Sequence, residues 1–406
     1  MPKPTLTETK SFKNDFPFFQ GRSIHYLDSA ATTHKPKSVI DAMNKFYSES
    51  YSTVRRGVYQ LSAQATQTYE ATRKKTAQLL GATSENEIIF TSGTTQSINL
   101  VAYSYARKFI KAGDEILVSA MEHHANIVPW QLACEETGAH LKVIPMNDQG
   151  ELLLDEYQKL LSSKTKLVAV NYVSNALGTI NPLKEMTQMA HQVGARILVD
   201  GAQSTSHLQI NVAELDIDFY AFSGHKIYGP TGIGILYGKK ELLEQMPPYQ
   251  SGGDMIENVT FEKTTFLPPP HRFEAGTPAV AEIIGLNAAL DYLNSVGLET
   301  IAQHEAQLLE YGTQKLQSID GLTLMGTAKK KAGILAFTIK NIHPHDIATL
   351  LDESHVIIRS GHHCAQPIMQ RFGVNATARA SLGLYNSFED LDALVDGLER
   401  VKRIFG

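Results

Sequence analysis

The sequence predicts an α/β protein with a large domain built on a mostly parallel sheet and a smaller α+β domain after it. From Tyr26 to about Gly285, short apolar runs alternate with longer amphipathic stretches, which is the pattern of strands and helices in a parallel sheet. Beyond this point the pattern changes to a long helical stretch and a second α+β unit that includes GILAFTIK at residues 333–340. The length of 406 residues also exceeds what one core usually holds, so two domains are expected.

The candidate strands of the large domain are short, apolar and bounded by turn-forming residues. They lie at residues 87–90, 115–120, 166–173, 196–200, 218–223 and 232–237. Residues 249–278 are rich in glycine and proline and predict an excursion from the core. The predicted division is an N-terminal arm over residues 1–25 that packs with the small domain, a large domain over 26–288 and a small domain over 289–406.

Composition narrows the class of protein. Hydrophobic residues make up 43% and charged residues 19% of the chain, as in an ordinary globular enzyme. The net charge of −5 and the lack of a long basic tract argue against nucleic acid and membrane surfaces as partners, and no apolar run is long enough to span a membrane. The first residues do not have the pattern of a secretory signal peptide, and two cysteines are too few for a disulfide framework. We therefore expect a cytoplasmic protein.

A carboxylate and a lysine follow two successive candidate strands. Asp200 ends RILVD, and Lys226 comes shortly after DFYAFS. The carboxyl ends of parallel strands meet at one edge of a sheet, where ligands bind. Pyridoxal 5′-phosphate needs both groups there, because a lysine holds its aldehyde as a Schiff base and a carboxylate keeps its ring nitrogen protonated. The pair therefore predicts a site for this cofactor.

Hydroxyl groups follow other strands at the same edge. Thr94 and Thr95, in FTSGTTQSINL, start a predicted helix whose free N–H groups and dipole favour a phosphate. Ser223 and His225 immediately precede Lys226 and are further candidate donors to that phosphate. The alternative for the threonines is a helix cap, which is the commoner role of such residues at a helix start.

Three more side chains are candidates to hold the cofactor ring. His123, in MEHHANIVPW, is placed to stack on a flat ring, although a surface or cap histidine is the alternative. Its neighbour His124 is expected to be structural. Asn175, in NYVSNALGT, and Gln203, three residues after Asp200, are candidates to bond the phenolic oxygen of the cofactor.

The stretch VIIRSGHHCAQPIM, at residues 356–369, indicates a strand, a turn and a helix start. Cys364 then lies near a helix N-terminus and beside His362 and His363, and both features favour a reactive thiolate. Metal binding by this His-His-Cys run is the alternative, but contiguous ligands point in different directions, so no metal site is expected. Cys134, on an amphipathic stretch, is expected to be a buried small hydrophobe.

Two arginines are candidates to bind a substrate carboxylate. Arg379 lies in TARASLGLYN, and Arg359 precedes the glycine of RSGHHCA. A guanidinium group pairs with a carboxylate through two parallel hydrogen bonds, which lysine cannot copy. An ordinary salt bridge is the alternative for either residue.

The order of these motifs resembles the SufS-type (group II) cysteine desulfurases and the related selenocysteine lyases, in the class-V aminotransferase-like family of pyridoxal phosphate enzymes. The resemblance extends from about Tyr26 onward and rests on YLDSAATT, SGTT, EHHANIVPW, VSNALGT, VDGAQ, FSGHKIYGPTGIG, RFEAGTP and RSGHHCA. It implies fold type I, with a seven-stranded sheet in the large domain, and a homodimer. It also implies that Lys226 carries the cofactor and removes the α-proton of L-cysteine, with His123 stacked on the ring.

The resemblance further implies that Cys364 accepts the sulfur as a persulfide, leaving alanine, and passes it to a SufE-like or SufU-like protein for iron-sulfur cluster assembly. Selenium release from L-selenocysteine is the alternative activity. Arg379 would bind the substrate carboxylate, and Thr277, with Arg272 as a second candidate, would reach the partner subunit's phosphate. The chain departs from the family's VHRGVH, because Arg55 and Tyr59 replace histidines while Arg56, a candidate to position the substrate, is kept.

Overall fold

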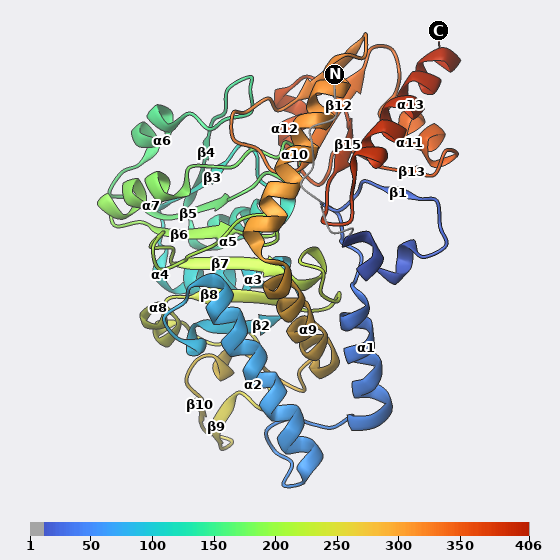
Figure 1. Cartoon of the computed structure of the whole chain (residues 1–406). Coiled ribbons are helices and arrows are strands. Elements are labelled where there is room, and N and C mark those ends of the chain that lie inside the picture. Colours follow the sequence, from blue (N-terminus) through green and yellow to red (C-terminus); the bar gives the residue numbers. More distant parts are fainter. Residues whose placement is uncertain (1–11, 406) are drawn as a thin grey trace.

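A seven-stranded sheet forms the centre of the structure, a computed structural model that describes residues 12–405 (Figure 1). Strand β8 is antiparallel to its neighbours β2 and β7, and the remaining pairs are parallel. The mostly parallel seven-stranded sheet is thus confirmed. Its strands, in spatial order, are β2 (Ile88–Thr91), β8 (Gly234–Gly238), β7 (Phe219–Ser223), β6 (Arg196–Asp200), β5 (Thr165–Asn171), β3 (Glu115–Ser119) and β4 (His140–Ile144).

Both faces of this sheet are buried, because successive residues of each central strand point to opposite sides. In β6, Ile197 and Val199 pack into one hydrophobic cluster and Leu198 packs into the other. The first cluster is covered by α2 (Gln60–Leu80), α6 (Leu154–Leu160), α7 (Leu183–Gln192) and α9 (Val280–Val296). The second is covered by α3 (Thr94–Val101), α5 (Val128–Thr137) and α8 (Lys240–Gln245), and it contains Cys134, which is buried as expected.

The small domain is a separate α+β layer with its own core, and it lies at one end of the molecule in orange and red (Figure 1). Its antiparallel sheet has the order β11 (Leu322–Met325), β12 (Ile334–Ile339), β15 (Thr377–Ser381) and β14 (Arg359–Gly361). Its helices are α10 (Leu298–Gln317), α11 (Pro344–Asp352), α12 (Gln366–Arg371) and α13 (Phe388–Phe405). The predicted boundary at residue 288 lies inside α9, so the exact division stays a prediction.

Residues of the predicted N-terminal arm contact both domains; the first eleven residues lie outside the described part of the chain. The ring of Phe16 lies 5.8 Å from that of Tyr228 and 5.0 Å from that of Tyr385. Strand β1 (His25–Tyr26) then pairs in parallel with β13 (Val356–Ile357), and the chain continues into α1 (Lys37–Lys45).

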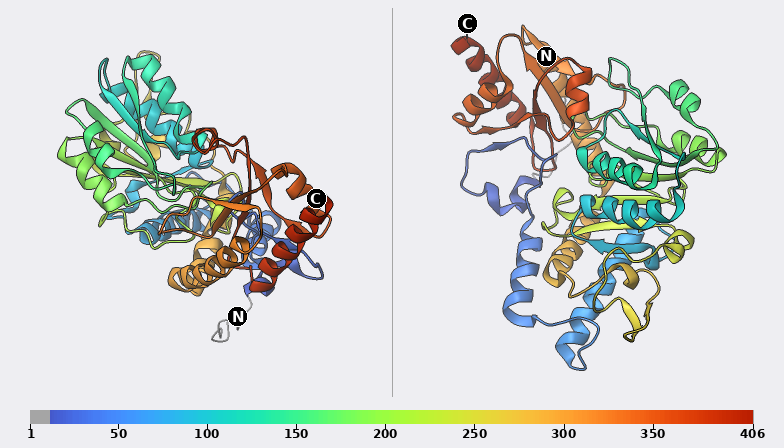
Figure 2. Two further views of the ribbon diagram at one scale, coloured as in Figure 1. Left: turned by 90° about the horizontal axis from the view of Figure 1, so that it is seen from above. Right: turned by 180° about the vertical axis from the view of Figure 1, so that it is seen from behind.

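The predicted excursion leaves the large domain at the end opposite the small domain. It carries a hairpin of β9 (Ile256–Val259) and β10 (Thr264–Phe266). Figure 2 shows this hairpin in yellow near the connection between α1 and α2, and Figure 1 shows the same arrangement from the other side. Elsewhere in the large domain, the short helix α4 (Arg107–Phe109) precedes β3. Within residues 12–405, no helix is both long and apolar enough to cross a membrane.

Candidate active site

A cavity of about 290 Å³ lies at the carboxyl edge of the large sheet, where the loops of the small domain approach it. Most of the predicted site residues line it. From the large domain they are Thr94, Thr95, His123, Asn175, Asp200, Gln203, Ser223, His225 and Lys226, and from the small domain Arg359, Cys364 and Arg379. Arg56 and Thr277 are not among the lining residues of this cavity.

Lys226 and Asp200 lie at the ends of adjacent parallel strands. Lys226 ends the 3-10 turn Gly224–Lys226 directly after β7, and Asp200 is the last residue of β6. Burial lowers the pKa of Lys226 to about 8, although the charge of Asp200 opposes this shift. Burial raises the pKa of Asp200, while the N–H of Ala202, 2.9 Å from its Oδ1, and the charge of Lys226 lower it. The cavity therefore holds an amine that can lose its proton near neutral pH, beside a buried carboxyl group.

The start of α3 supplies the hydroxyl groups of the cavity. Gly93 precedes the helix and no side chain caps it, so the helix-cap alternative for the threonines does not apply. Instead, the N–H of Thr94 donates to Ser223 Oγ at 2.8 Å, and Thr94 Oγ1 lies 2.7 Å from the same oxygen. This close approach requires glycine in β8, because a Cβ at Gly234 would lie 2.3 Å from Gly93 Cα. A hydroxyl-rich helix start in a cavity is suited to a phosphate.

Three histidines line the cavity, and two of them, His123 and His225, are neutral near pH 7. Burial, with the charge of Lys226, lowers the pKa of His123 to about 4. The same two causes, together with the charge of Lys35, lower the pKa of His225 to about 4. The Nδ1 of His123 accepts a hydrogen bond from the N–H of Ala125 at 3.0 Å, which fixes the ring orientation. An oriented neutral ring suits stacking on a flat ligand, and that stacking stays a prediction.

Glu122 supports the turn that carries His123, and the sequence reasoning missed it. The side chain is fully buried and accepts hydrogen bonds from the N–H of Asn171 at 2.9 Å and from Asn126 Nδ2 at 2.7 Å, and also from the Ser119 hydroxyl. Burial raises its pKa to about 8. These bonds connect the His123 turn to the end of β5. A glutamate next to two histidines gives no sequence signal of such burial.

The two candidate amides are partly engaged by the protein itself. Asn175 Nδ2 donates to the backbone oxygen of His363 at 2.6 Å, and Gln203 Nε2 donates to the backbone oxygen of Ala30 at 2.7 Å. The Oδ1 of Asn175 is buried and finds no partner within residues 12–405. Both residues line the cavity, but their bonding to a cofactor oxygen remains a prediction.

Both candidate arginines share Asp28, a second residue that the sequence reasoning missed. Arg379 Nη2 donates to Asp28 Oδ1 at 3.1 Å, and Arg359 Nε donates to Oδ2 at 3.2 Å. Arg379 is only 2% exposed, and its Nε has no partner in the described part of the chain. Both arginines therefore form the salt bridge that was the alternative to binding a substrate carboxylate. A substrate carboxylate entering the cavity would compete with Asp28 for these guanidinium groups.

Cys364 lies exposed in the loop between β14 and α12 and lines the same cavity. Its N–H donates to His362 Nδ1 at 3.0 Å, and its backbone oxygen accepts from the N–H of His124 at 2.7 Å. His363 is buried instead, with Nε2 at 2.9 Å from Thr377 Oγ1, and burial lowers its pKa to about 3. The exposed thiol thus faces a cavity whose other wall carries Lys226.

Arg55 and Tyr59, which replace histidines of the family pattern, do not line the cavity, and neither does Arg56 between them. Arg55 Nη2 lies 2.8 Å from the buried Glu274 Oε2, and Arg56 Nε lies 2.7 Å from Asp254 Oδ1. These ion pairs connect the loop before α2 to the excursion of residues 249–278. Thr277 is exposed on that excursion. Arg55 therefore acts as an ion-pair partner where the family has a histidine.

Comparisons with known proteins agree on one family. The sequence profile of the aminotransferase class-V family matches residues 25–394. The chain is 50% identical to a cysteine desulfurase of Synechococcus elongatus, aligning 98% of this chain but 66% of that protein. It is 49% identical to a cysteine desulfurase of Escherichia coli, with 97% and 98% of the two chains aligned.

Solved structures give the same result for the fold. The cysteine desulfurase CsdA of Escherichia coli superposes with a TM-score of 0.92 at 42% identity, over 97% of this chain and 98% of that one. The apo cysteine desulfurase of Thermococcus onnurineus superposes with a TM-score of 0.93 at 39% identity, over 99% and 98% of the chains.

Proposed function

The chain belongs to the aminotransferase class-V family, and from this premise we propose that it is a cysteine desulfurase that uses pyridoxal 5′-phosphate. The observation that carries the proposal is that Lys226, Asp200 and the exposed thiol of Cys364 line one cavity. L-Cysteine and the Cys364 thiol would give L-alanine and a Cys364 persulfide. The substrate's carbon–sulfur bond breaks, a sulfur–sulfur bond forms and the carbon gains a proton. The sulfur is oxidised as the carbon is reduced, so no external oxidant is needed.

The residues that line the cavity support the proposed cofactor. Thr94, Thr95 and Ser223 line it at the start of α3, where Thr94 and Ser223 are hydrogen-bonded, and such a hydroxyl-rich helix start suits a phosphate. The buried Asp200 lies beside Lys226 at the sheet edge, as a protonated pyridine nitrogen and an aldehyde carbon require. When bound, the cofactor would supply an electron sink for the α-carbon of the substrate.

The protein's own groups would perform the remaining tasks. Lys226, with its pKa lowered to about 8, can hold and return a proton at the substrate carbon. Arg379, with Arg359 beside it, would hold the substrate carboxylate in place of part of its contact with Asp28. Cys364 would approach the substrate sulfur from the small-domain side as the nucleophile.

The proposal is tested by the products. Purified enzyme incubated with L-cysteine and no keto acid should form L-alanine, and the Cys364 peptide should gain the mass of one sulfur atom. Alanine that forms only with added keto acid would identify an aminotransferase instead. Comparing turnover of L-cysteine with that of L-selenocysteine separates a desulfurase from the alternative, a selenocysteine lyase.

We also propose a homodimer, because exposed apolar side chains gather at the end opposite the small domain. Tyr47, Tyr51 and Val58 lie between α1 and α2, and Phe261 lies in the β9–β10 hairpin; the first two residues are 56% and 66% exposed, and the other two are fully exposed. Large apolar side chains exposed on one end of a protein are typical of an interface. Exposed Thr277, on the same excursion, would then reach the phosphate of the other subunit. A monomeric enzyme with full activity would contradict this arrangement.

The persulfide must finally leave the enzyme. Because Cys364 lies exposed on a loop, we propose that a SufE-like or SufU-like protein collects the sulfur for iron-sulfur cluster assembly. A persulfide carrier requires a reducing compartment, so we place the enzyme in the cytoplasm. A persulfide that persists at Cys364 after stoichiometric addition of either type of acceptor would contradict that acceptor's role.

A further inference from the structure

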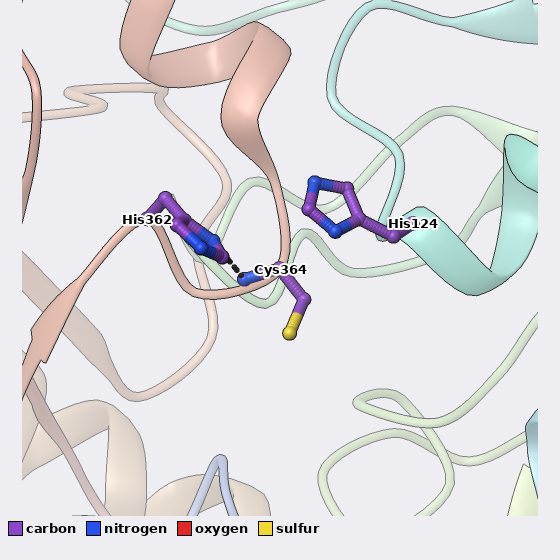
Figure 3. Close-up of side chains that lie close together, drawn as sticks. All are labelled: His124, His362 and Cys364. Carbon is purple, nitrogen blue, oxygen red and sulfur yellow. Dashed lines mark hydrogen bonds between the residues drawn. The ribbon is translucent and has the colours of Figure 1, made fainter.

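Three side chains next to the cavity have the composition of a metal site. Among the described residues, His124, His362 and Cys364 each place one ligand atom so that all three atoms lie within 4.8 Å of one another (Figure 3). The expectation of no metal site rested on the contiguous run of His362, His363 and Cys364. The structure turns His363 into the interior, bonded to Thr377, and brings His124 to the other two from a distant part of the chain.

The two segments that carry these ligands are held together by their backbones. His124 begins the 3-10 turn His124–Asn126, and its N–H donates to the oxygen of Cys364 at 2.7 Å. In Figure 3 its ring faces the loop that carries the other two residues. His362 and Cys364 are exposed and His124 is partly exposed, so an ion in solvent has access and the side chains have room to turn.

We propose that His124, His362 and Cys364 bind Zn²⁺ reversibly and that the bound ion blocks the Cys364 thiol. One thiolate and two imidazoles are a ligand set that Zn²⁺ accepts, with bonds of about 2.3 Å to sulfur and about 2.0–2.1 Å to nitrogen. Tetrahedral ligands at those bond lengths lie closer together than 4.8 Å, so side-chain rotation must close the site. Three protein ligands leave a fourth position for water.

Existing hydrogen bonds make this site weaker than a permanent one. The N–H of Cys364 donates to His362 Nδ1 at 3.0 Å, and the N–H of Gln366 donates to His124 Nε2 at 3.1 Å. In each ring, a metal that binds the accepting nitrogen displaces the hydrogen bond. A metal that binds the other nitrogen moves the ring proton onto the accepting nitrogen, which can then no longer accept. Both hydrogen bonds are therefore lost on binding. In return, a bound ion gains the thiolate of Cys364 and two imidazole nitrogens as ligands. The balance indicates reversible binding.

The proposed binding can be measured without any assay of activity. The holoenzyme, stripped of metals with a chelator, is titrated with Zn²⁺ against a competing chromophoric chelator. We expect one ion per chain. His124→Ala, His362→Ala and Cys364→Ser should each weaken binding about tenfold or more. His140→Ala, on the exposed edge strand β4, is the matched control and should bind as the parent does.

Alkylation gives a second readout. Cys134 is buried, so iodoacetamide should modify the folded protein at Cys364, and one equivalent of Zn²⁺ should slow that reaction in the parent but not in His124→Ala. His124→Gln, checked by circular dichroism and visible absorbance, covers the case in which the alanine variant does not fold. The proposal would be overturned if His124→Ala and His362→Ala both bound Zn²⁺ with the affinity of the parent. It would also be overturned if iodoacetamide modified Cys364 at the same rate when the site is filled with Zn²⁺.

The inhibitory consequence rests on the proposed desulfurase function, whereas the binding does not. Zn²⁺ should suppress persulfide formation in the parent at concentrations that fill the site, and a chelator should restore it. If the chain formed no alanine from cysteine, the titration would still decide whether the site exists. If the titration failed, the desulfurase reaction would stand unaffected.

Discussion

The two halves of the active cavity are built by opposite means. Lys226 and Asp200 lie at the ends of buried parallel strands, and burial shifts the pKa of both. Cys364 lies exposed on a loop in which His363 and Cys364 both have a φ of 54°, in the left-handed region. The two groups whose pKa the fold shifts thus lie at the ends of buried strands. The thiol that we propose passes sulfur to another protein lies at the surface.

The largest effect is expected in the buried half. Lys226→Ala would remove both the proposed attachment point of the cofactor and the proposed proton carrier, so turnover of L-cysteine should fall by about 10⁴-fold, the upper range for loss of a positioned acid–base group. The visible absorbance of the lysine-bound cofactor should disappear as well. Absorbance spectra of the purified variant and alanine formation measure the two losses. A variant that kept both would contradict the assignment of Lys226.

The second-largest effect is expected for Cys364→Ser, which should affect sulfur transfer without affecting the cofactor. Cys364→Ser should keep the visible absorbance, because Cys364 comes from the small domain, whereas Lys226 and Asp200, which we propose hold the cofactor, come from the strands of the large domain. Persulfide formation and sulfur delivery should fall by several orders of magnitude, since serine cannot carry the sulfur. Cys134→Ser, at the buried thiol on α5, is the matched control and should still form the persulfide. Sulfide release at the parent rate by Cys364→Ser would show that the exposed half is dispensable.

The halves also differed in how far the sequence predicted them. The six strands chosen from apolar runs correspond to β2, β3, β5, β6, β7 and β8, and the ends of four of them supply Asp200, Lys226, His123 and Asn175. The seventh strand, β4, escaped the pattern because HLKVI is a partly exposed edge strand with polar residues between its apolar ones. Apolar periodicity therefore predicted the strands whose ends form the large-domain side of the cavity.

Contacts between distant segments could not be read from the sequence. Asp28 is followed by small residues, and nothing local shows that both Arg379 and Arg359 converge on it. His124 is predicted to be structural because it points away from its neighbour His123 on any regular backbone, yet the fold brings it to Cys364. Arg55 likewise meets Glu274 across 219 positions of sequence. These pairings depend on how loops pack, which periodicity does not encode.

A smaller effect is expected for Glu122, the buried side chain that supports the turn carrying His123. Glu122→Ala leaves the N–H of Asn171 and the amide of Asn126 without an acceptor in the core. Loss of such a buried acceptor costs about 1–3 kcal/mol, so the thermal midpoint of the holoenzyme should fall. Glu122→Gln keeps one acceptor oxygen and should lose less. An alanine variant as stable as the parent would show that the His123 turn needs no such support.

The pH dependence of stability gives a separate test of Glu122. Burial raises its pKa in the folded protein from the ordinary 4.5 to about 8, so the folded state binds this proton more tightly than the unfolded state does. The stabilising contribution of the protonated carboxyl is complete below pH 4.5 and is lost as the pH rises towards 8. The stability of the parent relative to Glu122→Gln should therefore decline across that range. A constant difference between their unfolding midpoints would exclude a raised pKa.

The smallest effect is expected in the exposed half, where two neighbouring histidines form a matched pair. His362 is exposed, and its ring accepts a single hydrogen bond from the N–H of Cys364, so His362→Ala should change the free energy of unfolding by no more than about 0.5 kcal/mol. His363 is buried and lies 2.9 Å from Thr377 Oγ1, so His363→Ala should cost about 1–3 kcal/mol. Chemical denaturation measures both. Equal costs would mean that the outward side of the Cys364 loop is packed as tightly as its inward side, and the description of this loop as exposed at His362 and Cys364 would fail.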